Sequence, residues 1–135
     1  MTPAKEAKRG GLLVRAEEAL RFLPASVTVK VAPLPEVARV PGAPAELLGI
    51  ALLDGAILPI VAIGAEAAEA TSVIVCSYLG EEIGLVGLSV LETGHFEVDP
   101  DGVSVRYRGE HARALDLAPI YARLQSGPWA GRWRG

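Results

Sequence analysis

The dipeptide Asp54-Gly55 separates two short apolar runs, and this arrangement constrains the fold more than any other feature of the 135-residue chain. The runs cover residues 49–53 and 56–61. Asp-Gly favours a two-residue hairpin turn because a type I′ turn needs positive φ at both central residues. We therefore predict a β-hairpin over these runs. Pro59 has no N–H to donate to a ladder, so we expect it to face a sheet edge or a bulge.

Three further stretches repeat the pattern of apolar runs around polar turn residues. Hairpins are predicted over residues 12–23, 73–91 and 95–107. Their turns are expected at Ala16-Glu17-Glu18, at Gly80-Glu81-Glu82 and at Asp99-Pro100-Asp101-Gly102. Gly84 and Gly87 lie in the returning run of the second of these hairpins, where they predict a bulge or a close approach of neighbouring atoms.

The other segments are defined by alternation and by proline. Apolar and polar residues alternate over residues 27–31, which predicts a strand. Four prolines between residues 32 and 46 exclude a regular helix and predict a rigid, extended connection. Residues 114–117 are predicted to form a last short strand, and Pro119 suits the first position of a helix that continues over residues 120–125.

Several short strands spaced by turn signals predict an all-β fold, a small barrel or a sandwich, with little helix. Half of the residues are hydrophobic but only 5% are aromatic, so the core must be aliphatic. The length suits one domain, or two very small subdomains. We expect a flexible N-terminal tail over residues 1–9, a domain over residues 10–125 and a loose C-terminal tail over residues 126–135.

Charge and targeting signals argue against nucleic-acid binding, secretion and membrane insertion. The net charge is only −3 and the charges are interspersed, so the strong positive field of a nucleic-acid-binding face is not expected. The N-terminus is polar with no apolar run behind it, so no signal peptide is predicted. The apolar stretch over residues 47–62 is interrupted and too short to span a bilayer. The expected compartment is the cytoplasm, without direct membrane insertion.

Few residues suit catalysis or metal binding. His95 and His111 lack further ligands at a useful spacing, so surface histidines are favoured over a zinc site. Cys76 lies in a β-branched run, which favours a buried, inert thiol over a nucleophile. The glycines of residues 80–87 lack the Lys-Ser/Thr of a phosphate-binding loop. We therefore predict no enzyme activity and no cofactor.

The segment over residues 128–134 carries Trp129 and Trp133 together with two arginines. Trp and Arg are enriched at binding hot spots, so the segment could anchor a partner. The alternative is a loose end or a segment packed on the chain's own surface, which we favour because termini are usually loose.

The segment over residues 37–61 combines a Pro/Ala-rich approach with Gly49-Ile50-Ala51-Leu52-Leu53-Asp54-Gly55, and then with Ala56-Ile57-Leu58-Pro59-Ile60-Val61. This segment resembles the signature stretch of CheW-like domains. The family has "GVINLRG" and "IVPVIDLR" at these places, and the resemblance extends over about residues 11–125. It implies two small five-stranded SH3-like β-barrel subdomains packed together, with a short C-terminal helix.

The resemblance also implies a non-catalytic adaptor. Family members couple the cytoplasmic domain of methyl-accepting chemoreceptors to the regulatory domain of the histidine kinase CheA, and a groove takes the receptor hairpin. The receptor-facing residues implied for this chain are Lys30, Val37, Arg39, Leu52 and Asp54, and those implied for a kinase contact are Val86 and Leu88. The alternative function left open is a small β-barrel module that binds a ligand or a nucleic acid.

Two charges differ in sign from the family pattern. Asp54 stands where "NLRG" has Arg, and Lys30 stands where "VQEI" has Glu. A paired inversion preserves an internal ion pair while it reverses the sign offered to a partner, so we predict that these two residues lie close together. The alternative is two independent changes of surface residues. Further departures at residues 62–64, at Leu88 and over residues 96–113 also allow an adaptor that binds a receptor without the kinase.

Overall fold

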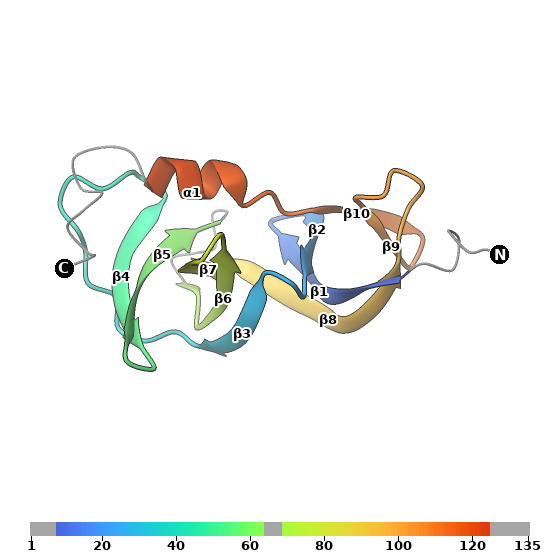
Figure 1. The fold of residues 1–135 in the computed structure, drawn as a ribbon. Helices are drawn as coiled ribbons and strands as arrows, with labels where there is room; N and C mark the ends of the chain where they lie inside the picture. The colour runs from blue at the N-terminus through green and yellow to red at the C-terminus, as the bar shows by residue number, and fades with distance from the viewer. Residues whose placement is uncertain (1–7, 64–68, 125–135) are drawn as a thin grey trace. The chain divides into compact units, whose positions relative to one another are not determined.

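A computed structural model describes residues 8–63 and 69–124, which form ten strands and one short helix (Figure 1). The elements are β1 (Lys8–Ala16), β2 (Ala19–Pro24), β3 (Thr28–Pro33), β4 (Leu47–Leu53), β5 (Ala56–Ala62), β6 (Ser72–Tyr78), β7 (Glu81–Val86), β8 (Leu88–Glu97), β9 (Val105–Tyr107), β10 (Glu110–Ala114) and α1 (Ala118–Leu124). The chain divides into a first unit, residues 1–28 and 88–115, and a second unit, residues 29–87 and 116–135.

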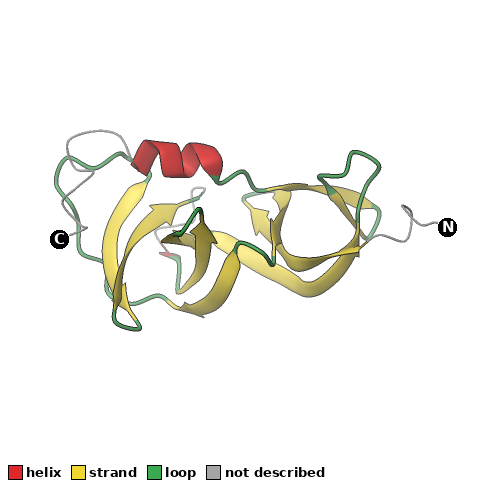
Figure 2. Ribbon diagram, in the orientation of Figure 1, coloured by secondary structure: helices red, strands yellow, loops and turns green. Residues whose placement is uncertain are grey.

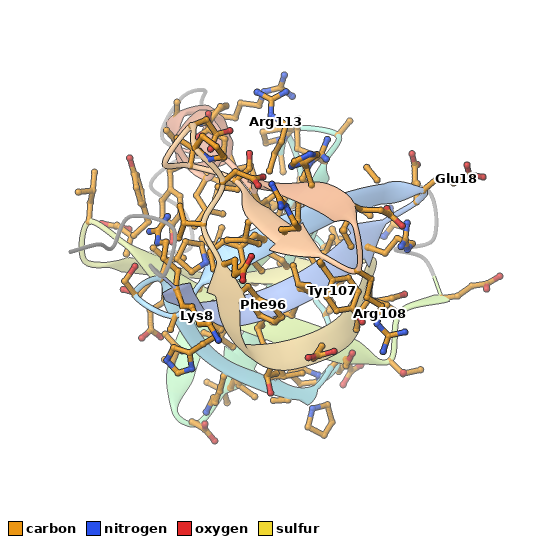
Figure 3. All side chains as sticks on the ribbon, turned by 90° about the vertical axis from the view of Figure 1, so that its right-hand side faces the viewer. Lys8, Glu18, Phe96, Tyr107, Arg108 and Arg113 are labelled. Atoms are coloured by element: carbon orange, nitrogen blue, oxygen red, sulfur yellow. The ribbon has the colours of Figure 1, made fainter. Side chains whose placement is uncertain are left out.

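The first unit is a five-stranded sheet in the order β8-β1-β2-β10-β9. β1 pairs antiparallel with β2 and with β8, and β10 pairs parallel with β2. A bridge between Val98 and Val105 joins the two ends of the sheet, so that it closes on itself. The Phe22 side chain is fully buried and makes an edge-to-face contact with Phe96, which makes a second edge-to-face contact with Tyr107. Figure 3 shows Phe96 and Tyr107 near one another, with Arg108 beside the Tyr107 ring.

The second unit is a five-stranded sheet in the order β3-β6-β7-β5-β4. Its core is aliphatic, as the scarcity of aromatic residues predicts, and is built from Ala51, Leu58, Ile60, Val73, Val75 and Val86. A bridge between Ala38 and Ile50 connects the chain that follows β3 to β4, at the other edge of the sheet. The two five-stranded sheets and the single short helix confirm the predicted fold class (Figure 2).

The central hairpin forms as predicted. Asp54 and Gly55 have φ of 51° and 82°, the positive values that a type I′ turn requires, and β4 pairs antiparallel with β5 across them. Pairing between β5 and β7 begins at Ile60, one residue after Pro59. The ladder to β7 therefore needs no donor at Pro59, which is paired with Ile50 of β4 on its other side.

Three predicted boundaries are wrong. The turn between β6 and β7 is Leu79-Gly80, with φ of 52° and 83°, and Glu81 already belongs to β7. The returning run over residues 83–91 is two strands because Gly87, with φ of 95°, separates β7 from β8. The last strand is β10 rather than residues 114–117, because it forms by pairing with β9 and β2 and not from an apolar run.

Gly84 is a point of close approach, as predicted. A Cβ atom there would lie 2.6 Å from Val73 Cγ2 and 2.8 Å from Ile60 Cδ1. β1 begins at Lys8, so the last two residues of the predicted N-terminal tail are in a strand. The rest of that tail and the predicted C-terminal tail, residues 126–135, lie outside the described residues.

The helix α1 belongs to the second unit and lies beside its strands in Figure 2. Its Tyr121 hydroxyl donates a 2.6 Å hydrogen bond to the carbonyl oxygen of Glu81 in β7. Arg123 forms an ion pair with Glu46, just before β4. Within residues 8–63 and 69–124, no helix has the length and apolar character needed to cross a membrane.

Candidate partner-binding groove

An open groove of about 470 Å³ lies on the second unit, between the β4–β5 hairpin and the chain that follows β3. Its lining residues are Glu36, Val37, Ala38, Ile50, Ala51, Leu52 and Ile57. Most of these side chains are apolar, and Glu36 contributes the one carboxylate. A shallow apolar surface of this kind suits contact with a protein segment better than enclosure of a small substrate, which needs a deeper cavity.

The hairpin turns two large apolar side chains outward. Leu52 and Ile57 are directly opposite one another across the Asp54-Gly55 turn, and they are 64% and 49% exposed. Their neighbours Ala51 and Leu58 point into the core, because successive side chains of a strand lie on opposite faces. An exposed pair of this size is typical of an interaction surface.

The other wall of the groove is held to the hairpin by backbone hydrogen bonds. The Ala38 N–H donates to Ile50 oxygen and the Ile50 N–H donates to Ala38 oxygen, both at 2.8 Å. Gly49 permits this approach: a Cβ atom there would lie 2.1 Å from the Ala38 oxygen. The extended, proline-rich connection predicted from the sequence is therefore positioned by β4.

Lys30 on β3 and Asp54 in the hairpin turn form an ion pair between Nζ and Oδ2. This contact confirms the prediction that the two residues with inverted charge lie close together. Their side chains are 39% and 68% exposed, so solvent and salt screen the attraction and the pair contributes about 0–1 kcal/mol to folding. The pair leaves both charges accessible at the surface, where they can influence a partner.

The structure brings several predicted site residues together. Val37 and Leu52 line the groove, and Asp54 follows Leu52 by two residues with Lys30 bound to it. Arg39 is exposed next to the wall residue Ala38 but does not line the groove. That these residues bind a partner stays a prediction.

Ile57 and Ile50 were missed by the sequence reasoning, although both line the groove. The signal for Ile57 was present: counting outward from the Asp54-Gly55 turn pairs it with Leu52 on the outer face. For Ile50 no comparable signal existed, because its place depends on the bridge to Ala38.

Val86 and Leu88, the two residues implied for a kinase contact, are buried. Val86 is 1% exposed and belongs to the core of the second unit, and Leu88 is 9% exposed at the start of β8. Both side chains are needed for packing, since β7 and β8 turn them inward. These residues do not offer a partner an apolar contact in this structure.

The cysteine and the histidine–carboxylate contact that could suit catalysis or metal binding lie outside the groove. Cys76 is buried, as predicted, and burial raises the pKa of its thiol to about 12, which disfavours the thiolate. His111 Nδ1 lies 2.6 Å from the buried carboxylate of Asp99, and Arg106 lies 3.3 Å from the same carboxylate. Among the residues that the structure describes, no three His, Cys, Asp or Glu side chains gather as a metal site would require.

Comparison with known proteins agrees with this architecture. A sequence profile described as the CheW-like domain matches residues 10–116. Among curated proteins the comparison finds no match. A similar solved structure is that of the scaffolding protein TtCheW from Thermoanaerobacter tengcongensis, with a TM-score of 0.69 and 17% identity over 82% of this chain and 90% of that chain. At this identity the likeness concerns the fold, whereas the profile covers most of the chain. The chain belongs to the family of CheW-like domains.

Proposed function

We propose that this protein is a non-catalytic adaptor of a bacterial chemosensory system, and that its groove binds the cytoplasmic signalling region of a chemoreceptor. The observation that carries the proposal is the exposed pair Leu52 and Ile57, in an apolar groove beside the Lys30–Asp54 ion pair. Family membership supports an adaptor role. The proposal places the protein in the cytoplasm, recruited to receptor arrays.

The geometry of the groove favours an amphipathic helix as the bound segment. Such a helix presents apolar residues along one stripe and places them in an apolar groove. Leu52 and Ile57 would contact that stripe, and the charged rim would determine the position and direction of the helix. The interface would bury on the order of 1,000 Å² or less, so it would be weak alone and strong when repeated in an array.

The inverted ion pair supports a matched change of charge in the partner. Asp54 is the more exposed member, so the hairpin turn presents negative charge where the family pattern presents Arg. A receptor segment that carries Lys or Arg at the contacting position is therefore favoured over one that carries Glu or Asp.

The structure supports a receptor contact more strongly than a contact with the kinase. The groove supports the receptor contact, but the two residues expected at a kinase contact, Val86 and Leu88, are buried. We therefore favour receptor binding over binding to the regulatory domain of a CheA-type kinase. An adaptor that binds both remains the second form of the proposal.

A pull-down against receptor signalling regions and against the kinase regulatory domain tests the proposal. Leu52→Ala removes a central apolar contact and should weaken receptor capture about tenfold, as expected for loss of a hot spot worth more than 1 kcal/mol. Val103→Ala is the matched control, because Val103 is 54% exposed in the first unit. Equal loss in both variants, or full retention in Leu52→Ala, would refute the groove as the receptor site.

The role of the ion pair is tested with Asp54→Arg, with Lys30→Glu and with the double variant. Each single change places like charges side by side, and the double change restores the pair with the opposite sign. If the sign matters to the partner, the double variant should fold as well as the wild type and still lose the receptor. Restored binding in the double variant would show that only the internal pairing is needed.

A further inference from the structure

A second hollow, of about 430 Å³, lies on the second unit between the β6–β7 turn and α1. It is lined by Tyr78, Leu79, Glu81, Ala118, Tyr121 and Ala122, and shares no residue with the groove described above. The proposed adaptor function makes no use of it.

Leu79 makes this hollow unusual. Its side chain is 86% exposed, the largest exposure among the large apolar residues that the structure describes, and its φ of 52° is one that side-chain-bearing residues rarely adopt. The positive φ belongs to the two-residue turn Leu79-Gly80, as it does at Asp54-Gly55. The exposure of the apolar side chain is not explained by the turn, and an apolar contact from another segment would account for it.

The floor of the hollow is fixed and apolar. The Tyr121 hydroxyl donates to Glu81 oxygen, and the rings of Tyr78 and Tyr121 lie 5.0 Å apart between centroids. Ala118 and Ala122, one turn apart on α1, are exposed and small, so they leave space above the Tyr121 ring. A flat aromatic side chain suits this space, because rings prefer offset or edge contacts with other rings.

We propose that the chain's own C-terminal segment, residues 128–134, docks in this hollow with the Trp129 ring between Leu79 and Tyr121. The segment contains both tryptophans of the chain, Trp129 and Trp133, and it follows directly on the helix that lines the hollow. The segment can therefore place a large aromatic side chain against the apolar floor of the hollow.

Length and charge agree with this occupant. An extended chain spans about 3.3–3.6 Å per residue, so the five steps from Leu124 to Trp129 reach about 17 Å. The six steps along α1 from Ala118 to Leu124 span only about 9 Å. Residues 125–135 contain two arginines and no acidic residue, and Glu81 is the one charged residue that lines the hollow. The positive charge of the segment thus matches the negative charge of the lining.

Tryptophan fluorescence tests the proposal directly, because no described residue is a tryptophan and all indole emission comes from the segment. The variant Trp133→Phe leaves Trp129 as the single reporter. Its emission in the folded protein should lie at shorter wavelength than in the urea-unfolded protein. Adding Leu79→Asp should move the folded emission to the unfolded position, whereas Leu52→Asp, a control in the groove, should leave it unchanged.

A second substitution distinguishes loss of docking from loss of folding. Ala122→Gln keeps a good helix former at an exposed position and fills the hollow with a larger side chain. It should produce the same red shift, with circular dichroism unchanged. Folded emission that already coincides with that of the unfolded protein would overturn the proposal, as would a blue shift insensitive to both substitutions. A blue shift lost on dilution, with a dimer in size-exclusion chromatography, would also overturn it and assign the hollow to a second copy.

Discussion

Replacing Gly49 by alanine tests how the groove is built. Gly49 has a φ of 153°, and a Cβ atom there would meet the backbone of the opposite wall, 2.1 Å from the Ala38 oxygen and 2.8 Å from its carbonyl carbon. A backbone atom cannot rotate aside as the end of a flexible side chain can. The Gly49→Ala protein must therefore move the segment around Ala38 away from β4.

The cost follows from what that movement breaks. Two backbone hydrogen bonds join Ala38 and Ile50, and each contributes about 0.5–1.5 kcal/mol net. The unfavourable φ for a residue with a side chain adds about 1–3 kcal/mol. The total loss in the free energy of unfolding is therefore roughly 2–6 kcal/mol, a large part of the 5–15 kcal/mol typical of a whole domain.

Urea unfolding followed by circular dichroism measures this loss, and amide hydrogen exchange locates it. The matched control is Gly42→Ala, since Gly42 has a φ of 80° but no atom within 4 Å of a built Cβ, so it should cost only about 1–2 kcal/mol. In Gly49→Ala alone, the amides of Ala38 and Ile50 should lose protection. The reasoning is refuted if both variants lose the same stability and those two amides stay protected.

Three further substitutions follow from the packing of the second unit. Gly84→Ala should cost about 1–3 kcal/mol in urea unfolding, because the added methyl would overlap the buried Val73 side chain; an unchanged midpoint would mean that the core adapts freely. Tyr121→Phe should cost about 1–3 kcal/mol, since it leaves the Glu81 carbonyl without its 2.6 Å donor, and a thermal melt equal to wild type would contradict this. Burial raises the pKa of the Cys76 thiol to about 12, so only the unfolded thiol, with a pKa near 8.5, ionises between these values. Stability should therefore fall as pH rises above about 8.5, and Cys76→Ala should remove this part of the pH dependence of the urea midpoint.

The turns were predicted well where their residues carry a conformational preference of their own. Asp54-Gly55 adopts positive φ at little cost, and the flanking runs are apolar, so local and long-range preferences agree. The Leu79-Gly80 turn was placed one residue late because leucine rarely occupies the first position of such a turn. The missed turn is also the most exposed apolar site, as expected where local preference yields to another requirement.

Strands that depend on distant partners were harder to predict. β10 has mostly polar residues and buries only Ala112, so nothing in its own sequence distinguishes it from a loop. It is a strand because β9 and β2 pair with it. The run over residues 83–91 has Ser89 as its one polar side chain, and the positive φ of Gly87 marks where it divides between the two units.

In the groove too, features set by the local sequence pattern were predicted, and features set by distant contacts were not. Alternation along the hairpin is enough to place Leu52 outward and Ala51 inward. The Lys30–Asp54 contact was predicted because two departures from one family pattern compensate each other in charge. The wall at Ala38 could not be predicted, because it depends on a bridge between segments that share no sequence pattern.

The groove and the ion pair both lie where β3 and the chain that follows it meet the β4–β5 hairpin. β3 and β4 are the edge strands of that sheet, and unpaired edges favour unwanted association. The Ala38–Ile50 bridge and the Lys30–Asp54 pair connect these two edges, one through the backbone and the other through charge. In the proposed adaptor, this seam between β3 and β4 would couple partner binding to the contacts that join the two edges. Substitutions there will therefore change stability and binding together, unless they are confined to side chains such as Leu52 that point away from the seam.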